Sequence, residues 1–206
     1  MSKIVSKEFF SENVVKLEVE APLIARSRKA GHFVIVRVDA NGERIPLTIA
    51  DSDTEKGTIT LVIQKIGASS TKITNLNVGD ELLDVVGPLG KATHIDKFGT
   101  VVCSGGGVGV APLLPIIKAM KAAGNKVISV LAARTKDLVI LEEQVREYSD
   151  EVVIMTDDGS YGKAGRVTDG IEEIAKREKV DLCVTIGPAI MMKFVSLLTK
   201  KYDIPT

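Results

Sequence analysis

The stretch Ser104-Gly-Gly-Gly-Val-Gly-Val-Ala-Pro112 decides the fold of the second half of this 206-residue chain. It follows an apolar run, Gly99–Cys103, with the composition of a strand, and leads into a helix-like run, Leu113–Ala123. A strand, a glycine-rich turn and a helix bring the main chain close to a phosphate, since glycine permits sharp turns and a helix N-terminus presents N–H donors. The pattern Gly107-x-Gly109-x-x-Pro112 is close to the dinucleotide-binding fingerprint, with proline in place of the third glycine. A glycine-rich turn in another kind of α/β protein is the alternative that this stretch alone leaves open.

Residues 98–206 alternate strand-like and helix-like segments. The strand candidates are Thr100–Cys103, Lys126–Ala132, Glu151–Thr156 and Asp181–Ile186, and the helix candidates that follow them end at Ala123 or span Leu138–Ser149, Val167–Arg177 and Ala189–Lys201. This order predicts an α/β domain with a doubly wound parallel sheet. Such sheets bind ligands at the carboxyl ends of their strands. The loops expected there are Gly105–Gly109, Ala133–Asp137, Asp157–Gly165 and Gly187-Pro188.

Residues 1–97 are instead rich in β-branched residues and are broken by Asn, Gly, Asp and Pro. The strand candidates are Lys3–Phe10, Val14–Glu20, His32–Val38, Arg44–Ala50, Thr58–Gln64 and Glu81–Val86. Short strands at this spacing predict a small antiparallel β-barrel or sandwich, with one short helix over Ser70–Leu76. We therefore expect two domains, residues 1–97 and residues 98–206.

Two motifs in the β-rich half carry groups that bind phosphate. In Arg44-Ile-Pro-Leu-Thr48, the arginine can pair bidentately with a pyrophosphate, Leu47 can offer an apolar face to a planar ring, and Thr48 can hydrogen-bond a ring nitrogen. In Gly67-Ala-Ser-Ser-Thr71, hydroxyls and N–H groups at a helix start can form an anion nest. An edge strand with a solvated arginine, and ordinary serine capping of a helix, are the structural alternatives.

The composition excludes several classes of partner. The 27 basic and 27 acidic residues balance, so we expect neither nucleic acid nor an anionic membrane as a partner. No apolar run approaches a membrane span and the N-terminus lacks a signal-peptide core, which predicts a cytoplasmic protein. Cys103 and Cys183 are too few for a disulfide framework or a metal cluster. No metal site is predicted, since Asp157–Gly162 lacks the ligand spacing of a calcium loop.

Taken in order, the motifs Arg-x-Pro-Leu-Thr, Gly-x-Ser-Ser-Thr, Gly-Pro-Leu-Gly and Gly-Gly-Val-Gly-x-Ala-Pro resemble those of the ferredoxin–NADP reductase superfamily, over essentially the whole chain. The runs Ala132–Glu143, Thr156–Gly162 and Gly187–Met192 resemble a narrower group within it. That group contains the small (alpha) subunit of the NADH-dependent ferredoxin:NADP oxidoreductase, of the sulfide dehydrogenase type, and the electron-transfer subunit of dihydroorotate dehydrogenase B. The first is the nearer, mainly through the run Ala133-Arg-Thr-Lys-Asp137.

The resemblance implies a flavoprotein oxidoreductase that passes hydride between NAD(P)H and FAD and sends electrons onward to an iron–sulfur carrier. It implies that Arg44 binds the FAD pyrophosphate, that Leu47 flanks the isoalloxazine, and that Thr48, the residue nearest the chemistry, hydrogen-bonds near flavin N5. Many relatives have tyrosine where Leu47 stands, so weaker ring stacking is expected here. The further FAD-binding residues expected are Pro46, Ile63, Gln64, Lys65, Gly67, Ser69, Ser70 and Thr71. The dinucleotide-binding residues expected are Gly105, Gly106, Gly107, Val108, Gly109, Pro112, Arg134, Asp157, Gly187 and Pro188.

The expected partners are a large flavin- and iron–sulfur-containing subunit and ferredoxin or a similar carrier. Three alternatives stay open. The chain can be the electron-transfer subunit of a dihydroorotate dehydrogenase B, a non-catalytic subunit that holds FAD for a partner, or a nucleotide-binding regulator whose match at Arg44–Thr48 is accidental.

The choice between NADH and NADPH rests on the end of the second strand of the α/β half. A Rossmann fold usually places there an acid that binds the ribose 2′-hydroxyl. Here the strand ends in Ala133-Arg-Thr-Lys136, and Arg134 and Lys136 could meet a 2′-phosphate. The nearest relatives use this subunit as their NADH site, so NAD(H) is the expectation, with a solvated Arg134 as the structural alternative.

A cysteine-rich tail that binds a [2Fe–2S] cluster follows this region in relatives. Such a cluster takes about four thiolate ligands, and this chain has two cysteines. A shortened chain and a cluster-free variant both account for this, and we expect the former. The cluster is therefore expected in a full-length form and not in residues 1–206.

Overall fold

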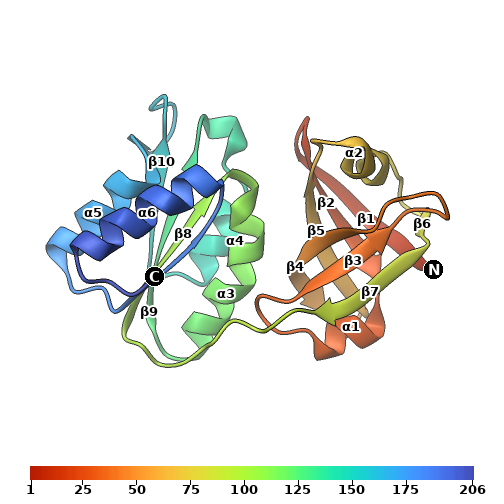
Figure 1. Cartoon of the computed structure of the whole chain (residues 1–206), viewed down its shortest axis with the longest axis horizontal. Coiled ribbons are helices and arrows are strands. Elements are labelled where there is room, and N and C mark those ends of the chain that lie inside the picture. The colour runs from red at the N-terminus through yellow and green to blue at the C-terminus, as the bar shows by residue number, and fades with distance from the viewer. The chain divides into compact units, whose positions relative to one another are not determined.

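Residues 1–206 are all described by a computed structural model, in which the chain divides into two units, Met1–Thr93 and His94–Thr206 (Figure 1). The first unit is a seven-stranded antiparallel sheet that curls into a nearly closed barrel, with the strand order β6-β1-β2-β5-β4-β3-β7. Its strands are β1 (Ser2–Ser11), β2 (Val14–Glu20), β3 (Phe33–Arg37), β4 (Ile45–Asp53), β5 (Thr58–Gln64), β6 (Glu81–Leu82) and β7 (Asp84–Leu89), and its helices are α1 (Pro22–Ser27) and α2 (Ala68–Thr74). The predicted antiparallel barrel is confirmed.

Alternating side chains fill the barrel. Ile4, Leu17, Val34, Ile59 and Leu61 are completely buried, because each occupies an inward position on a strand whose side chains alternate between the two faces. Burial of this apolar surface is the main force that holds the barrel together.

One short segment closes the barrel. The residues predicted as a single strand over Glu81–Val86 form two strands instead, since β6 pairs with β1 while β7 pairs with β3. The break falls at Leu83, whose N–H donates to the carbonyl oxygen of Val38 at 3.1 Å. A change of pairing partner is a tertiary event, so the local sequence pattern does not reveal it.

The second unit is a parallel α/β layer structure, as predicted. Its strand order is β11-β10-β9-β8-β12, and every pairing is parallel. The strands are β8 (Thr100–Gly106), β9 (Lys126–Ala133), β10 (Glu151–Thr156), β11 (Lys163–Ala164) and β12 (Leu182–Ile186). The helices are α3 (Val110–Ala122), α4 (Glu142–Glu147), α5 (Val167–Arg177) and α6 (Ala189–Lys201), with 3₁₀ turns η1 (Gly107–Gly109) and η2 (Lys136–Leu138).

Helices cover both faces of this sheet. On one face, Ile171 of α5 and Val195 of α6 pack against Val102 of β8 and Ile128 of β9. Helices α3 and α4 lie on the other face (Figure 1). The helix predicted over Leu138–Ser149 is shorter than expected, because a 3₁₀ turn and an irregular segment precede α4.

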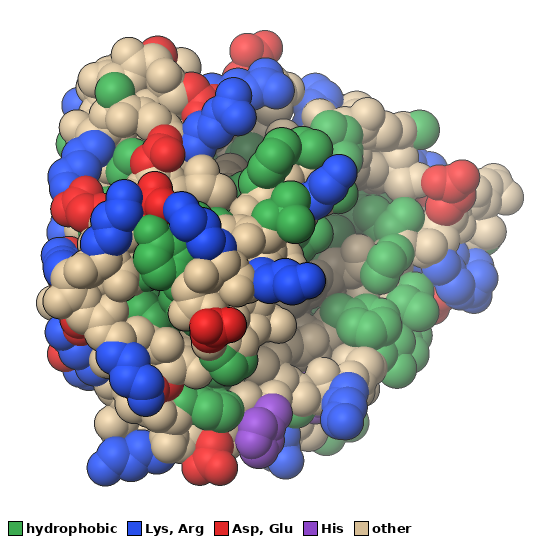
Figure 2. Space-filling view, turned by 60° about the vertical axis from the view of Figure 1, so that its left-hand side comes forward, with side chains coloured by type: hydrophobic (Ala, Val, Ile, Leu, Met, Phe, Trp, Pro, Cys, Tyr) green, Lys and Arg blue, Asp and Glu red, His purple; other side chains and the backbone are tan.

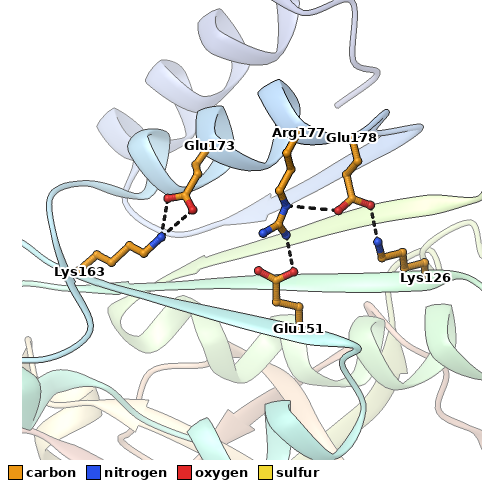
Figure 3. Close-up of polar contacts among 6 residues, drawn as sticks. All are labelled: Lys126, Glu151, Lys163, Glu173, Arg177 and Glu178. Carbon is orange, nitrogen blue, oxygen red and sulfur yellow. Dashed lines mark hydrogen bonds and ion pairs between the residues drawn. The ribbon is translucent and has the colours of Figure 1, made fainter.

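Ion pairs fasten α5 to the edge of the sheet (Figure 3). Lys163 of β11 donates to both carboxylate oxygens of Glu173 at 2.6 Å. One turn further along, at the C-terminal end of α5, Arg177 pairs with Glu151 and also contacts Glu178 at 3.3 Å. The remaining member of the network is Lys126, at the start of β9, which bonds Glu178. Exposed pairs contribute little singly, so the network mainly fixes the position of α5.

A buried asparagine holds the segment that leads into β8. The Asn125 side chain is almost fully buried, and its Oδ1 accepts the N–H groups of Phe98 at 2.7 Å and Gly99 at 3.0 Å. Its Nδ2 donates to the carbonyl oxygens of Asp96 and Met120 at 2.8 and 2.9 Å. One side chain therefore satisfies four backbone groups.

The surface mixes charged and apolar side chains. Basic and acidic groups are interspersed on the face that Figure 2 shows, with hydrophobic side chains among them. The large hydrophobic side chains that are exposed include four on α6, Ile190, Met192, Phe194 and Leu197. None of the helices has the length and apolar character needed to cross a membrane.

Candidate cofactor sites

The outward face of β4 carries part of the predicted flavin site. Ile45 and Leu47 pack against the barrel core and Ile49 is buried, so Pro46 and Thr48 point to the other face. Pro46 is exposed and Thr48 is partly exposed. Leu47, expected to flank the isoalloxazine, is half-buried against the barrel core, whereas Pro46 presents an apolar side chain on the same face as Thr48.

Arg44 lies immediately before β4, with 59% of its side chain exposed. One of its terminal nitrogens is 3.6 Å from Oδ2 of Asp84, which already accepts a 2.7 Å hydrogen bond from Arg37 Nε. The guanidinium of Arg44 is thus held loosely and can turn toward an anion that arrives at the surface.

A hydrogen bond brings the two predicted phosphate-binding motifs together. The Ser69 hydroxyl, in the first turn of α2, donates to Glu43 Oε2 at 2.5 Å. Glu43 precedes Arg44 in the chain, so this bond places the start of β4 beside the start of α2. Residues 26 positions apart in the sequence are therefore joined by the fold.

The Ser70 side chain caps the start of α2, whereas Gly67 leaves open space beside the main chain. The Ser70 hydroxyl accepts the N–H groups of Ile66 at 3.1 Å and Gly67 at 3.0 Å, so it caps the helix start, and the amide of Thr71 bonds the Gly67 carbonyl within α2. A Cβ built on Gly67 would meet no atom within 4 Å, and its φ of −145° suits any residue. Neither packing nor backbone geometry requires glycine here, and open space lies beside it for a ligand.

Three of the predicted flavin-binding residues, Ile63, Gln64 and Lys65, lie at the end of β5 or directly after it. Ile63 is only 1% exposed and belongs to the barrel core, so its side chain does not line a surface ligand as expected, and only its backbone is placed to do so. Gln64 and Lys65 are exposed at the end of the strand. Their side chains remain accessible.

These groups fit the phosphate end of FAD. A guanidinium and a hydroxyl are donors that suit a diphosphate, and Arg44 is the neighbour in the chain of Glu43, which bonds Ser69. The open side of Gly67 allows the ligand a close approach to the main chain.

The glycine-rich stretch after residue 104 is part strand and part turn. Gly105 and Gly106 are the last residues of β8, whereas Gly107, Val108 and Gly109 form the 3₁₀ turn η1. Gly107 has a φ of +54°, in the left-handed region that favours glycine. Pro112 lies in the first turn of α3, and no side chain caps this helix. The Val110 N–H, the first of α3, bonds the Gly107 and Val108 carbonyl oxygens, and Pro112 carries no N–H, so it is the glycine main chain of the turn that a phosphate can approach.

The turns after β8 and β12 pack against each other with glycine at every contact. A Cβ on Gly109 would approach the Gly187 Cα at 2.9 Å, and a Cβ on Gly106 would collide with Met191 Sδ. A Cβ on Gly187 would meet Met191 Cε at 2.6 Å, while Pro188, exposed, begins α6 as its N-cap. In this sheet β8 and β12 are neighbours at the point where the strand order reverses, the place at which open α/β sheets bind ligands. The close-packed glycines, which let the main chain approach a ligand, fit a dinucleotide.

The turns after β9 and β10 are joined through their backbones. Asp157 N–H donates to the Ala133 carbonyl at 3.1 Å, and Asp158 N–H donates to that of Arg134 at 3.3 Å. Arg134 and Asp157 are both exposed. The Ser160 side chain hydrogen-bonds Asp158 and lowers the pKa of that carboxyl, with further help from the Ser160 N–H. A basic and an acidic side chain thus lie at this edge together.

Burial governs the chemistry of the two cysteines. Both thiols are buried, and desolvation raises the pKa of Cys183 to about 12 and that of Cys103 further. Neither thiol ionises at neutral pH, so both act as apolar core groups. No group of three or more His, Cys, Asp or Glu side chains is arranged to hold a metal ion.

Sequence reasoning missed three residues at these sites. Met191 lies in a run singled out from the sequence, yet its packing on two glycines needed the structure. Glu43 accepts a hydrogen bond from Ser69, and Asp84 pairs with Arg44. Both carboxylates therefore occupy donors that a phosphate would use. Their only signal was that Glu43 is next to Arg44 in the chain.

Two family models match successive parts of the chain. Residues 1–94 match the model of the oxidoreductase FAD-binding domain, and residues 104–197 match that of the oxidoreductase NAD-binding domain.

The chain also resembles proteins over its full length. It is 42% identical to a dihydroorotate dehydrogenase B electron transfer subunit homolog of Thermotoga maritima, covering 100% of this chain and 72% of that protein. It is 33% identical to the dihydroorotate dehydrogenase B electron transfer subunit of Bacillus caldolyticus, covering 92% and 75%. A chain of the NADH-dependent reduced ferredoxin–NADP oxidoreductase structure has a TM-score of 0.94 and 38% identity, covering 99% of this chain and 74% of that one.

The barrel with its outward Arg44 and Thr48, the glycine contacts between the turns after β8 and β12, and these whole-length similarities agree. The chain therefore belongs to the ferredoxin–NADP reductase superfamily of FAD- and NAD-binding oxidoreductases.

Proposed function

We propose that this protein is the small subunit of a ferredoxin:NAD(P) oxidoreductase, in which residues 1–97 bind FAD and residues 98–206 bind the nicotinamide dinucleotide. Its role is to pass electrons between NAD(P)H and an iron–sulfur carrier. The observation that carries the proposal is the packing of Gly106 and Gly109 against the turn at Gly187, in a chain that also presents Arg44 and Thr48.

Each side chain has a binding or orienting task. Arg44 and Ser69 hold the diphosphate, and the outward Thr48 hydroxyl hydrogen-bonds the ring system. Gly107 and the glycine-rich turn before α3 hold the dinucleotide phosphates. When bound, FAD supplies the step between hydride chemistry and single-electron transfer. No side-chain general acid or base is needed.

We propose NAD(H) as the dinucleotide. Arg134 shares its edge of the sheet with the carboxylates of Asp157 and Asp158, whose backbones are bonded to the turn after β9. The negative charge of these two side chains is unfavourable for an added 2′-phosphate and compatible with a ribose hydroxyl.

The partners that we propose are a large flavin- and iron–sulfur-containing subunit and a ferredoxin-like carrier, with a [2Fe–2S] cluster in a full-length form. The similar proteins include electron transfer subunits, which supports a larger partner. The cytoplasmic location stays a prediction from the sequence.

A second candidate function is that of the electron-transfer subunit of a dihydroorotate dehydrogenase B. The observation in its favour is the 42% identity to such a homolog over the whole chain. The two candidates differ in the substrate of the partner subunit, so a reconstituted complex tested with dihydroorotate and with reduced ferredoxin separates them.

The test is anaerobic titration of the FAD-loaded protein with NADH and with NADPH, followed at the flavin absorption band. We expect the protein to be yellow and NADH to bleach it within milliseconds to seconds. A protein that holds FAD but is not reduced is a non-catalytic FAD-holding subunit. A colourless protein that fails to bind added FAD overturns the proposal and leaves the nucleotide-binding regulator.

A further inference from the structure

The Ser69 hydroxyl is already used by a carboxylate of the same chain. It donates to Glu43 Oε2 at 2.5 Å. A serine hydroxyl has a single proton to donate, so it cannot serve Glu43 and a phosphate oxygen at once. A diphosphate that binds Ser69 must therefore displace the Glu43 carboxylate.

A second contact holds the same loop against α2. Asp39, at the other end of the turn that connects β3 and β4, pairs with Lys72 of α2. That hydrogen bond is the main reason why the pKa of Asp39 lies below its usual value. Within the turn, Asn41 N–H bonds the Asp39 carboxylate at 3.0 Å. The loop over residues 39–43 is thus fastened to α2 by an ion pair at one end and by Glu43 at the other.

The negative charges beside this loop also oppose the binding of a diphosphate. Arg44 faces Asp84 at 3.6 Å, and Asp84 is bonded more closely by Arg37. A diphosphate that reaches Arg44 therefore meets the negative charges of both Glu43 and Asp84. Asp84 keeps Arg37 as its counter-ion, whereas the contact of Glu43 with Ser69 would be lost.

We propose that Glu43 is an internal competitor for the FAD diphosphate, which holds Ser69 in the free protein and lowers the affinity for phosphate-bearing flavins. This inference rests on the proposed FAD site. Binding of the diphosphate exchanges the bond between Ser69 and Glu43 for one between Ser69 and a phosphate oxygen. The loop over residues 39–43 then loses one of its fastenings to α2 and keeps the ion pair between Asp39 and Lys72.

The test is equilibrium titration of the apoprotein with FAD, with flavin fluorescence as the readout and no dependence on turnover. Glu43→Gln removes the charge and keeps the shape, and we expect it to lower the FAD dissociation constant about fivefold to tenfold. Glu20→Gln is the matched control, because Glu20 pairs with Thr58 at the end of β5 remote from Gly67. It makes the same change in net charge and should leave FAD binding unaltered.

Two further measurements test whether Glu43 competes with the phosphate groups of FAD. Riboflavin lacks phosphate, so its dissociation constant should be the same in the wild type and in Glu43→Gln. In a Ser69→Ala background the gain from Glu43→Gln should shrink, since the contested hydroxyl is gone.

The outcomes separate this inference from the proposed function. A wild-type protein that binds no FAD overturns the proposed function itself. A wild type that binds FAD, with Glu43→Gln no tighter than Glu20→Gln, overturns the inference alone. An equal gain for riboflavin, or an undiminished gain in the Ser69→Ala background, also overturns it.

Discussion

Gly109 lies so close to Gly187 that a Cβ added to Gly109 would come within 2.9 Å of the Gly187 Cα and within 2.5 Å of the Ile186 carbonyl oxygen. Both distances are shorter than real Cβ atoms show. The turns after β8 and β12 can therefore meet only while position 109 carries no side chain. Because this junction is where the strand order reverses, the spacing of two backbones defines the proposed dinucleotide site.

Gly109→Ala should disrupt that spacing. The added methyl group forces one turn away from the other, with an overpacking cost of about 1–3 kcal/mol. We expect the NADH dissociation constant to rise at least about tenfold, by isothermal titration. FAD binding is the control for folding of the other unit, and unchanged NADH binding would contradict the prediction.

Gly67→Val tests the open space beside α2. No atom lies within 4 Å of a Cβ at this position, so the melting temperature should change by only a few degrees while FAD affinity falls, because the side chain fills space proposed for the ligand. Asn77→Val, at an exposed position of the same unit, is the matched control. A variant that binds FAD as tightly as the wild type would show that this space is not used.

Arg44→Ala should separate binding from stability. The side chain is largely exposed and its ion pair with Asp84 is long, so the free energy of unfolding should change by less than about 0.5 kcal/mol. FAD retention should weaken about tenfold to a hundredfold, because a charge-assisted contact with the diphosphate is lost. Arg26→Ala, in the exposed last turn of α1, is the control. Equal FAD retention in both variants would count against the proposed site.

The sequence predicts the two-unit fold well because its signals are local. β-branched runs broken by turn residues predict the barrel, and apolar runs that alternate with helices predict the parallel sheet. The errors arise where distant segments decide the outcome. The split between β6 and β7 depends on two different partner strands, and α1 is too short to show helical periodicity.

The candidate sites likewise contain some residues that single motifs reveal and others whose placement depends on distant segments. Glycine, arginine and hydroxyl residues are predicted because their chemistry is visible in single motifs. The inward direction of Leu47 depends on the register of β4 against β3, where it lies opposite the buried Val34. The bond between Glu43 and Ser69 joins residues from separate elements, so no local pattern contains it.

Asn125→Leu should destabilise the second unit. The change removes four hydrogen bonds from a side chain that is almost fully buried and leaves the N–H groups of Phe98 and Gly99 without their acceptor. We expect a loss of about 2–4 kcal/mol, measured by urea denaturation. Asn13→Ala, at an exposed turn, should change the stability by less than about 0.5 kcal/mol. Similar values for the two variants would refute the structural role of Asn125.

Glu172 should make stability dependent on acid pH. A hydrogen bond from the Tyr202 hydroxyl, followed by one from Lys201, lowers the pKa of Glu172 from its usual 4.5 to about 2. Because the folded-state pKa is the lower one, this contribution is fully present above about pH 5 and is lost as pH falls toward 2. The stability difference between wild type and Glu172→Gln should therefore be constant near neutrality and shrink between pH 4.5 and 2. A difference that persists unchanged at the acid end would contradict this assignment.

The strand order of the second unit has a consequence for biosynthesis. All strands of the first unit, Met1–Thr93, precede β8 in the chain, so the ribosome makes them before any strand of the second unit. The junction of Gly109 with Gly187 cannot form until β12 has emerged, about 80 residues after Gly106. A nascent chain would thus contain every residue of the proposed flavin site before the proposed nicotinamide site is complete.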